Sequence, residues 1–186
     1  DALVARDRPG HADAVWRASG KLACVNIVPG AGLTHAMSGI AEAFMDNIPM
    51  LVLGCGIRRD TGKAFQLHDV DQLALVKPVT KAQLRPETGA DLYPMVRRAC
   101  AIARGGAPGP VFVEIPANLY LTAHDVDLTA QAKRRTGTQE AMVLSESSLK
   151  KAIKILKSSR MPLIYAGLGA APAAESLLEL AERLGA

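Results

Sequence analysis

The stretch that decides the fold is Leu22–Gly54, which reads LACVNIVPGAGLTHAMSGIAEAFMDNIPMLVLG. It begins with a largely apolar run at Leu22–Val28, which predicts a buried strand. Pro29–Leu33 interrupts that run, and Pro49 precedes a second apolar run, Met50–Gly54, which predicts a second strand. Between the two runs the apolar residues recur every three or four positions, so this stretch predicts a strand, a helix and a strand.

The helix between these strands is predicted from His35 to about Asp46, with Thr34 as its N-cap. Its apolar side chains recur on one face: Met37, Ile40, Ala43 and Phe44. A helix with one apolar face that follows a buried strand is expected to pack on the sheet to which that strand belongs.

The same alternation of strands and helices continues toward the C-terminus. We expect a polar loop at Gly56–Asp69, a short helix at Asp71–Val76, a long helix at Asp91–Arg104 and a third strand at Val111–Ile115. Pro94 fits only the first turn of a helix, which moves the expected start of the long helix to Tyr93. This pattern predicts an α/β fold with a parallel sheet flanked by helices.

The chain changes character after its third strand. Residues 123–139 are polar, basic and poor in large apolar side chains, which predicts a linker. We expect one domain at 1–121, a linker at 122–145 and the beginning of a second, Rossmann-like domain at 146–186, with a helix at 146–157, a strand at Leu163–Gly167 and a helix at 173–184. A single strand has no partner for its edge hydrogen bonds, so most of that second domain is expected to be missing.

Composition excludes several classes of protein. The chain has 186 residues, of which 49% are hydrophobic, and this content excludes a disordered chain. The longest apolar run is too short to cross a bilayer. The net charge of +4 comes from scattered basic pairs that do not alternate with the aromatic residues, so no nucleic-acid partner is expected. Three separated cysteines, each in an apolar segment, predict buried thiols in a reducing compartment, and hence a cytoplasmic protein.

Function is expected in the loops that follow the strands, because open parallel sheets bind ligands beyond the carboxyl ends of their strands. Those loops are 29–35, 55–69 and 116–120. Gly30 and Gly32 would let the backbone approach a ligand closely, and the helix that follows would offer free N–H groups. The alternative is that both glycines serve only the turn. The four histidines lack metal-ligand spacing, so no metal site is predicted.

Several short motifs in order carry a resemblance to a known family. They are GAGLTH at 30–35, GIAEA at 39–43, DNIPML at 46–51, AFQ at 64–66, DQ at 71–72, PVTK at 78–81 and PGPV…IP at 108–116. Over residues 11–121 the chain resembles the pyrimidine-binding domain of thiamine diphosphate enzymes, in the group of acetolactate synthase, oxalyl-CoA decarboxylase and 2-hydroxyacyl-CoA lyase. Residues 146–186 are similar to the start of that family's central domain. They correspond to a truncated Rossmann-like segment of it.

The resemblance implies a cofactor and its partners. In the family, thiamine diphosphate supplies the carbanion chemistry, and a glutamate of this domain hydrogen-bonds the aminopyrimidine ring. A separate domain of the neighbouring subunit holds the diphosphate through Mg²⁺, so the resemblance implies a homo-oligomer, or another chain that supplies this domain. A small-molecule substrate is implied, a 2-keto acid or an acyl-CoA compound. Some relatives bind FAD in the central domain, and the residues leave FAD undecided here.

The resemblance also assigns residues to the cofactor. Gly30, Ala31 and Gly32 match the family's Gly-Pro-Gly loop beside the pyrimidine ring, with Ala31 in place of proline. Thr34 and His35 stand where a Thr-Asn pair is usual. These five residues are therefore the expected cofactor-binding positions.

Other matched residues lie farther along the chain. Phe65 and Gln66 match a Phe-Gln pair that lines the substrate side, although Phe65 suits core packing equally well. Asp71, Gln72 and Lys81 fall on recurrent positions for which we expect structural roles, and Lys81 is expected to be solvated or ion-paired.

One position departs from the family. Counting back from the matching segment 12–21 places the expected catalytic glutamate near Ala5, and no His-Glu pair stands there. Asp7 is the only nearby carboxylate, with a shorter side chain two positions away. No catalytic residue is therefore assigned to this chain.

Three hypotheses follow from that departure. The first is a fragment of an acetolactate synthase-like lyase or transferase, incomplete at the N-terminus of its first domain and inactive alone. The second is a non-catalytic partner or regulatory module. The third is one subunit of a split thiamine-dependent enzyme.

Overall fold

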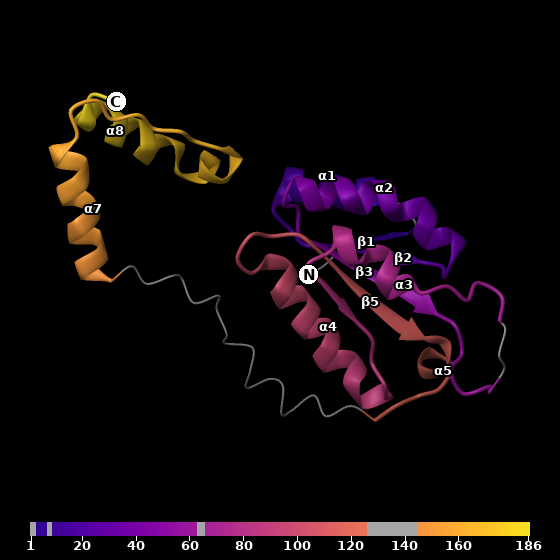
Figure 1. Cartoon of the computed structure of the whole chain (residues 1–186). Coiled ribbons are helices and arrows are strands. Elements are labelled where there is room, and N and C mark those ends of the chain that lie inside the picture. The colour runs from indigo at the N-terminus through magenta and orange to yellow at the C-terminus, as the bar shows by residue number, and fades with distance from the viewer. Residues whose placement is uncertain (1–2, 7–8, 63–65, 126–144) are drawn as a thin grey trace. The chain divides into compact units, whose positions relative to one another are not determined.

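A computed structural model describes residues 3–6, 9–62, 66–125 and 145–186 of the chain, and of 3–6 the backbone alone. The chain divides into two compact units, Asp1–Thr136 and Gly137–Ala186. Most of the expected linker at 122–145 lies outside the described residues. Figure 1 shows the elements of each unit.

The first unit is built on a five-stranded sheet in the order β1-β2-β3-β5-β4. The strands are β1 (Leu3–Arg6), β2 (Ala23–Ile27), β3 (Met50–Gly56), β4 (Ala82–Leu84) and β5 (Pro110–Pro116). All neighbouring pairs are parallel. The predicted α/β fold with a parallel sheet is therefore confirmed, and the three strands expected from the sequence are its central ones.

Helices cover both faces of this sheet (Figure 1). They are α1 (Pro9–Ser19), α2 (Ala31–Met45), α3 (Gln72–Val76), the 3-10 turn η1 (Lys77–Val79), α4 (Gly89–Arg104) and α5 (Ala117–Tyr120). On one face Val25 and Ile27 of β2 pack in a core with residues of α1, α2 and α3. On the other face Leu22 and Cys24 pack in a second core with residues of α4. Because side chains alternate along a strand, the β2 segment contributes side chains to both cores.

Two glycines of β3 make room for side chains of β5. A Cβ at Gly54 would lie 2.4 Å from two atoms of the Phe112 ring. A Cβ at Gly56 would lie 2.9 Å from Oε1 of Glu114. Phe112 and Glu114 are two residues apart on β5, as the glycines are on β3, so all four lie on one face of the sheet.

The start of α2 corrects the sequence-based prediction. The helix begins at Ala31, with Gly30 as its N-cap, rather than at His35 with Thr34 as its cap. Gly30 has φ 64°, in the left-handed region that favours glycine, so the chain turns directly from strand to helix. Thr34 lies in the first turn, where its Oγ1 donates to the carbonyl of Ala31 at 2.9 Å.

The start of α4 is also earlier than predicted. The helix begins at Gly89, because Thr88 and Asp91 form a capping box in which each side chain meets the other's backbone. Pro94 therefore lies inside the helix rather than in its first turn. At this position Pro94 cannot donate the backbone hydrogen bond of a helix interior.

The second unit contains helices and turns. They are α7 (Glu146–Ser158), η2 (Leu168–Ala173) and α8 (Ala174–Leu184). The strand predicted at Leu163–Gly167 is wrong: this segment has no regular secondary structure, and the side chains of Leu163 and Tyr165 are almost fully exposed. Among the described residues 145–186 there is no other strand to pair with it. Within the described ranges, no helix of the chain has the length and apolar character that a membrane span requires.

Candidate functional site

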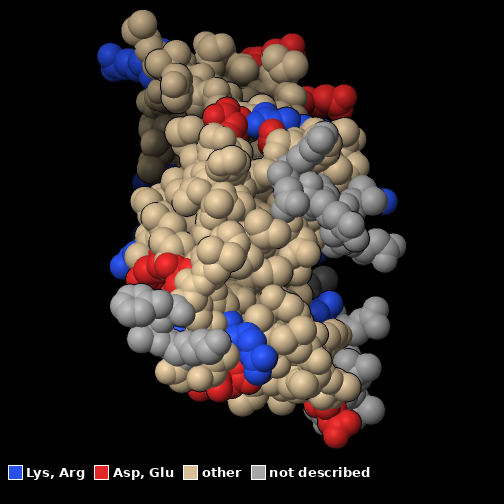
Figure 2. Space-filling view, turned by 90° about the vertical axis from the view of Figure 1, so that its right-hand side faces the viewer, with Lys and Arg blue, Asp and Glu red and all other residues tan. Residues whose placement is uncertain are grey.

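The loops that were predicted to carry function lie at one edge of the sheet. Because all five strands are parallel, their carboxyl ends open onto the same edge. Gly30 follows β2, Ile57 follows β3 and Ala117 follows β5 at that edge. Figure 2 views the chain from the side toward which the arrows of β3 and β5 point in Figure 1, and uncharged residues form the middle of that surface.

The predicted cofactor residues surround the turn from β2 into α2. Gly30 is buried and Gly32 half-buried, whereas Ala31, Thr34 and His35 are exposed. No side chain caps α2, so acceptors for the N–H groups of its first turn are absent among the described side chains. These free donors, at the positive end of a helix of 15 residues, suit a ligand that carries hydrogen-bond acceptors.

Both glycines of this turn are required by its surroundings. A Cβ at Gly30 would lie 3.1 Å from Cβ of His68 and 3.2 Å from the backbone of the same residue. A Cβ at Gly32 would lie 2.3 Å from Cγ2 of Val28. The missing Cβ atoms therefore leave room for His68 and Val28 of the chain itself, so both glycines serve the packing of the turn.

Gln72 ties this turn to the end of β3 through Gly30 and Cys55. Its side chain is buried at the start of α3. Oε1 accepts the N–H of Gly30 at 3.3 Å, and Nε2 donates to the carbonyl of Cys55 at 3.1 Å. The side chain of Asp71 accepts the N–H of Ala74 at 3.1 Å and so caps α3.

The loop after β3 is held by several hydrogen bonds. Nε2 of Gln66 donates to the carbonyl of Arg58 at 2.7 Å. The N–H of Arg59 donates to Oδ1 of Asn118 at 3.2 Å. Gln66 thus supports the loop through its amide, and Phe65, the other residue expected on the substrate side, lies outside the described residues.

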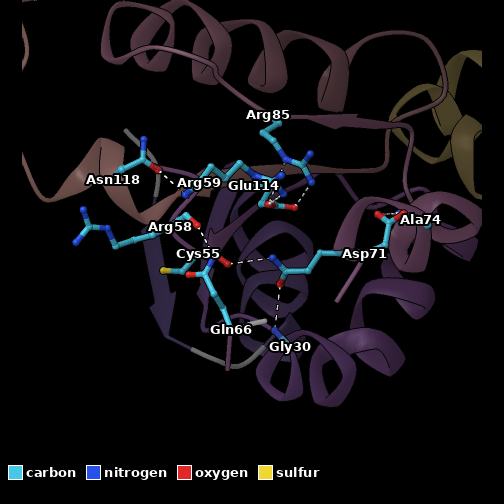
Figure 3. A network of polar contacts seen from close by, with 11 residues as sticks. Gly30, Cys55, Arg58, Arg59, Gln66, Asp71, Ala74, Arg85, Glu114 and Asn118 are labelled. Atoms are coloured by element: carbon cyan, nitrogen blue, oxygen red, sulfur yellow. Dashed lines mark hydrogen bonds and ion pairs between the residues drawn. The ribbon is translucent and has the colours of Figure 1, made fainter. Parts of the chain in front are cut away.

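A buried carboxylate joins three elements at the same edge (Figure 3). Glu114 of β5 is 2% exposed. Arg85 binds it through two hydrogen bonds, Nε to Oε1 at 3.1 Å and Nη2 to Oε2 at 2.8 Å, and Nη2 of Arg59 lies 3.2 Å from Oε1. Buried carboxylates require such partners, and the lone acid within the apolar run Val111–Ile115 was the sequence signal for them.

Lys81 has a structural role, as expected. It is half-buried, and its ammonium group donates to the carbonyls of Ile102 and Gly105, at the end of α4. Among the described residues its hydrogen-bond partners are thus two carbonyls that the helix leaves free, rather than a carboxylate. Burial lowers the pKa of Lys81 below its usual value.

No carboxylate stands at the position expected for the catalytic glutamate. Ala5 lies in β1, in register with Val25 of β2. Asp7, the nearest acid in the sequence, lies outside the described residues. The described part of this edge therefore offers backbone donors and glycine turns, but it offers no acid at that place.

The cysteines differ in burial, which corrects the prediction of three buried thiols. Cys24 is buried, whereas Cys55 and Cys100 are half-buried. Burial raises the pKa of the Cys24 thiol to about 11. A raised pKa keeps the proton on the folded protein, so this thiol's contribution to stability is present below its ordinary pKa of 9.0 and is lost as the pH rises toward 11.

The differences in burial predict the order in which the three cysteines are alkylated. With iodoacetamide at about pH 8, Cys55 should be modified first, and Cys24 should react at least ~100-fold more slowly because it is both buried and protonated. Mass spectrometry of digested samples taken over time measures each site. The same experiment in urea is the control, in which all three cysteines should react at similar rates. Equal rates for Cys24 and Cys55 in the native protein would contradict the described burial.

Comparisons with known proteins identify the chain's relatives. Residues 10–75 match the family model "Thiamine pyrophosphate enzyme, N-terminal TPP binding domain". The chain is 29% identical over 183 residues to the acetolactate synthase large subunit of Haemophilus influenzae, covering 93% of this chain and 31% of that protein. It is 36% identical over 116 residues to 2-hydroxyacyl-CoA lyase 2 of Danio rerio, covering 62% of this chain and 19% of that protein.

A solved structure supports the fold. The thiamine diphosphate-dependent 4-hydroxybenzoylformate decarboxylase of Rhodococcus jostii RHA1 matches with a TM-score of 0.73 and 24% identity, covering 83% of this chain and 29% of that chain. The chain thus spans about a third or less of the length of these relatives. By its sequence matches, the chain is similar to acetolactate synthase-like members of the thiamine pyrophosphate enzymes, and residues 10–75 match the N-terminal cofactor-binding domain of that family.

Proposed function

We propose that the turn at 30–35 binds the aminopyrimidine end of thiamine diphosphate. The observation that carries this proposal is the uncapped start of α2 at the carboxyl edge of the sheet, where no described side chain accepts the N–H groups of the first turn. The aminopyrimidine ring is flat, uncharged and rich in nitrogen acceptors, so it suits free N–H groups on a mostly uncharged surface. Ala31, Thr34 and His35 complete the proposed contact.

The described residues fit the ring but not the whole cofactor. When bound, thiamine diphosphate supplies carbanion stabilisation that no side chain can provide. This chain's turn would hold and orient the ring, while a domain beyond the described residues would hold the diphosphate with Mg²⁺. We therefore propose that the chain works as half of a site, within a homo-oligomer or with another chain, and has no activity alone. Use of FAD stays undecided.

The proposed activity of the complete protein follows its relatives. We propose an acetolactate synthase-like lyase or transferase that acts on small 2-keto acids or acyl-CoA compounds in the cytoplasm, with 1–121 as its pyrimidine-binding domain and 146–186 as the start of its central domain. Gln66 supports the loop on the proposed substrate side. Support comes from the matched domain and from the two sequence relatives described above.

Calorimetry with truncated cofactors tests the half-site. Thiamine, thiamine monophosphate and thiamine diphosphate should bind the chain with dissociation constants within about threefold of one another, because a turn that holds only the ring gains little from the phosphates. Adding Mg²⁺ should change none of them. Absence of binding by all three would refute the proposal. Thiamine diphosphate binding far more tightly with Mg²⁺ would show that this chain also holds the diphosphate.

A second candidate function is a non-catalytic partner or regulatory module, or one subunit of a split enzyme. The observation that favours it is Ala5 in β1, where the family's glutamate is expected. A stable complex of defined stoichiometry with a second, diphosphate-binding chain after co-expression would support this candidate. A chain that stays alone in size-exclusion chromatography would count against it.

A further inference from the structure

Gln72 connects two loops that lie far apart in the sequence. It is 2% exposed, and both polar atoms of its amide are used. Oε1 accepts the N–H of Gly30, in the turn after β2, and Nε2 donates to the carbonyl of Cys55, at the end of β3. One side chain from α3 therefore sets the separation between the two loops.

We propose that Gln72 is a positioning residue that couples ligand binding at the Gly30 turn to the order of the loop after β3. The inference rests on the proposed function for its ligand, but the contacts that carry it are independent of that function. A ligand that holds Gly30 in place also holds the Gln72 amide, and the amide holds the Cys55 carbonyl. By reciprocity, order in the loop after β3 would strengthen binding at the turn.

The surrounding contacts anchor the end of α3 that carries Gln72. Asp71 caps α3 directly before Gln72, and the backbone N–H of Gln72 donates to the carbonyl of Val70 at 2.8 Å. The helix end is therefore fixed, which leaves the two loops as the movable partners of the amide. Beyond Cys55, the loop is held through Arg59 by Asn118 and Glu114.

The chemistry of the position calls for an amide. Leucine has a similar volume but would remove the partner of the buried Gly30 N–H and of the half-buried Cys55 carbonyl. An ionised glutamate could accept from Gly30 but would place an anionic oxygen against the Cys55 carbonyl. A protonated glutamate could do both, because it has one acceptor oxygen and one O–H donor.

The first test compares Gln72→Leu with the matched control Gln83→Leu. Gln83 is half-buried in β4, and in the described part of the chain its amide donates to Thr80 and to neither loop. Hydrogen exchange of the full chain without ligand should be faster in Gln72→Leu at both 29–33 and 56–62, and unchanged there in Gln83→Leu. The thiamine dissociation constant should rise about tenfold in Gln72→Leu alone. Exchange profiles that match in the two variants would overturn the inference.

The second test uses Gln72→Glu, in case the leucine variant folds poorly. Burial raises the pKa of a carboxyl group, so near pH 5 the new side chain would be protonated and near pH 8 it would be largely ionised. We compare the thiamine dissociation constants of Gln72→Glu and Gln83→Leu at each pH. The two constants should be similar at the lower pH, and that of Gln72→Glu should be larger at the higher pH. If the ratio of these two dissociation constants does not change with pH, the result would count against the coupling. If thiamine does not bind the unmodified chain, the proposed function fails, and the exchange data still decide the coupling.

Discussion

Glu114→Ala is expected to lower the free energy of unfolding by about 3 kcal/mol. The carboxylate is buried on β5 and accepts two hydrogen bonds from Arg85 and one from Arg59. Removing it leaves two guanidinium groups facing each other without a counter-charge. The Arg85 side chain is 28% exposed, so water can solvate its charge only in part. Urea unfolding followed by circular dichroism measures the loss.

The matched control for this prediction is Arg59→Ala. Arg59 is 45% exposed and reaches Glu114 through a single contact at 3.2 Å, so its loss should cost less than about 1 kcal/mol. Glu114 would keep both hydrogen bonds from Arg85 in that variant. If the two substitutions destabilise the protein equally, the carboxylate is not the centre of this network.

The central part of the fold was predictable because its signals are local. The apolar runs at Leu22–Val28, Met50–Gly54 and Val111–Ile115 became the three inner strands, since each is buried on both faces and needs apolar side chains throughout. The edge strands β1 and β4 have only four and three residues and were missed. Strands of three or four residues are too short to show the two-residue repeat of a strand.

The errors at helix ends have a different cause. Thr34 and Asp91 are good capping residues, and each lies close to a helix start, but the structure uses Gly30 and Thr88 as the caps. In α2 the strand ends so near the helix that only glycine, with its positive φ, can make the turn. Sequence propensity alone cannot report how closely two elements follow one another in space.

The candidate site was predicted as a set of loops but not as a network. Parallel topology places the ends of β2, β3 and β5 at one edge, and this rule requires only the order of the elements. The bridge from Gly30 through Gln72 to Cys55 spans 42 and 17 positions in the sequence. Such distant pairings leave no local pattern, so the glutamine could be flagged as structural without its partners being known.

Gly54→Ala is expected to destabilise the protein by about 3 kcal/mol, by overpacking the core. The added Cβ would lie 2.4 Å from two atoms of the buried Phe112 ring. β3 cannot move aside easily, because Gly54 pairs with Ile27 of β2 on one side and with Glu114 of β5 on the other. Thermal and urea unfolding measure the loss, and the fold of the variant is checked by circular dichroism.

Two further variants decide whether this clash is the cause. Gly10→Ala makes the same chemical change on α1, where nothing lies within 4 Å of the new Cβ, and it should stabilise the protein by up to about 1 kcal/mol. Phe112→Leu removes the ring edge, so the double variant with Gly54→Ala should lose at least about 1 kcal/mol less than the two single losses combined. Strictly additive losses would mean that Gly54 is needed for its backbone rather than for the space that it leaves to Phe112.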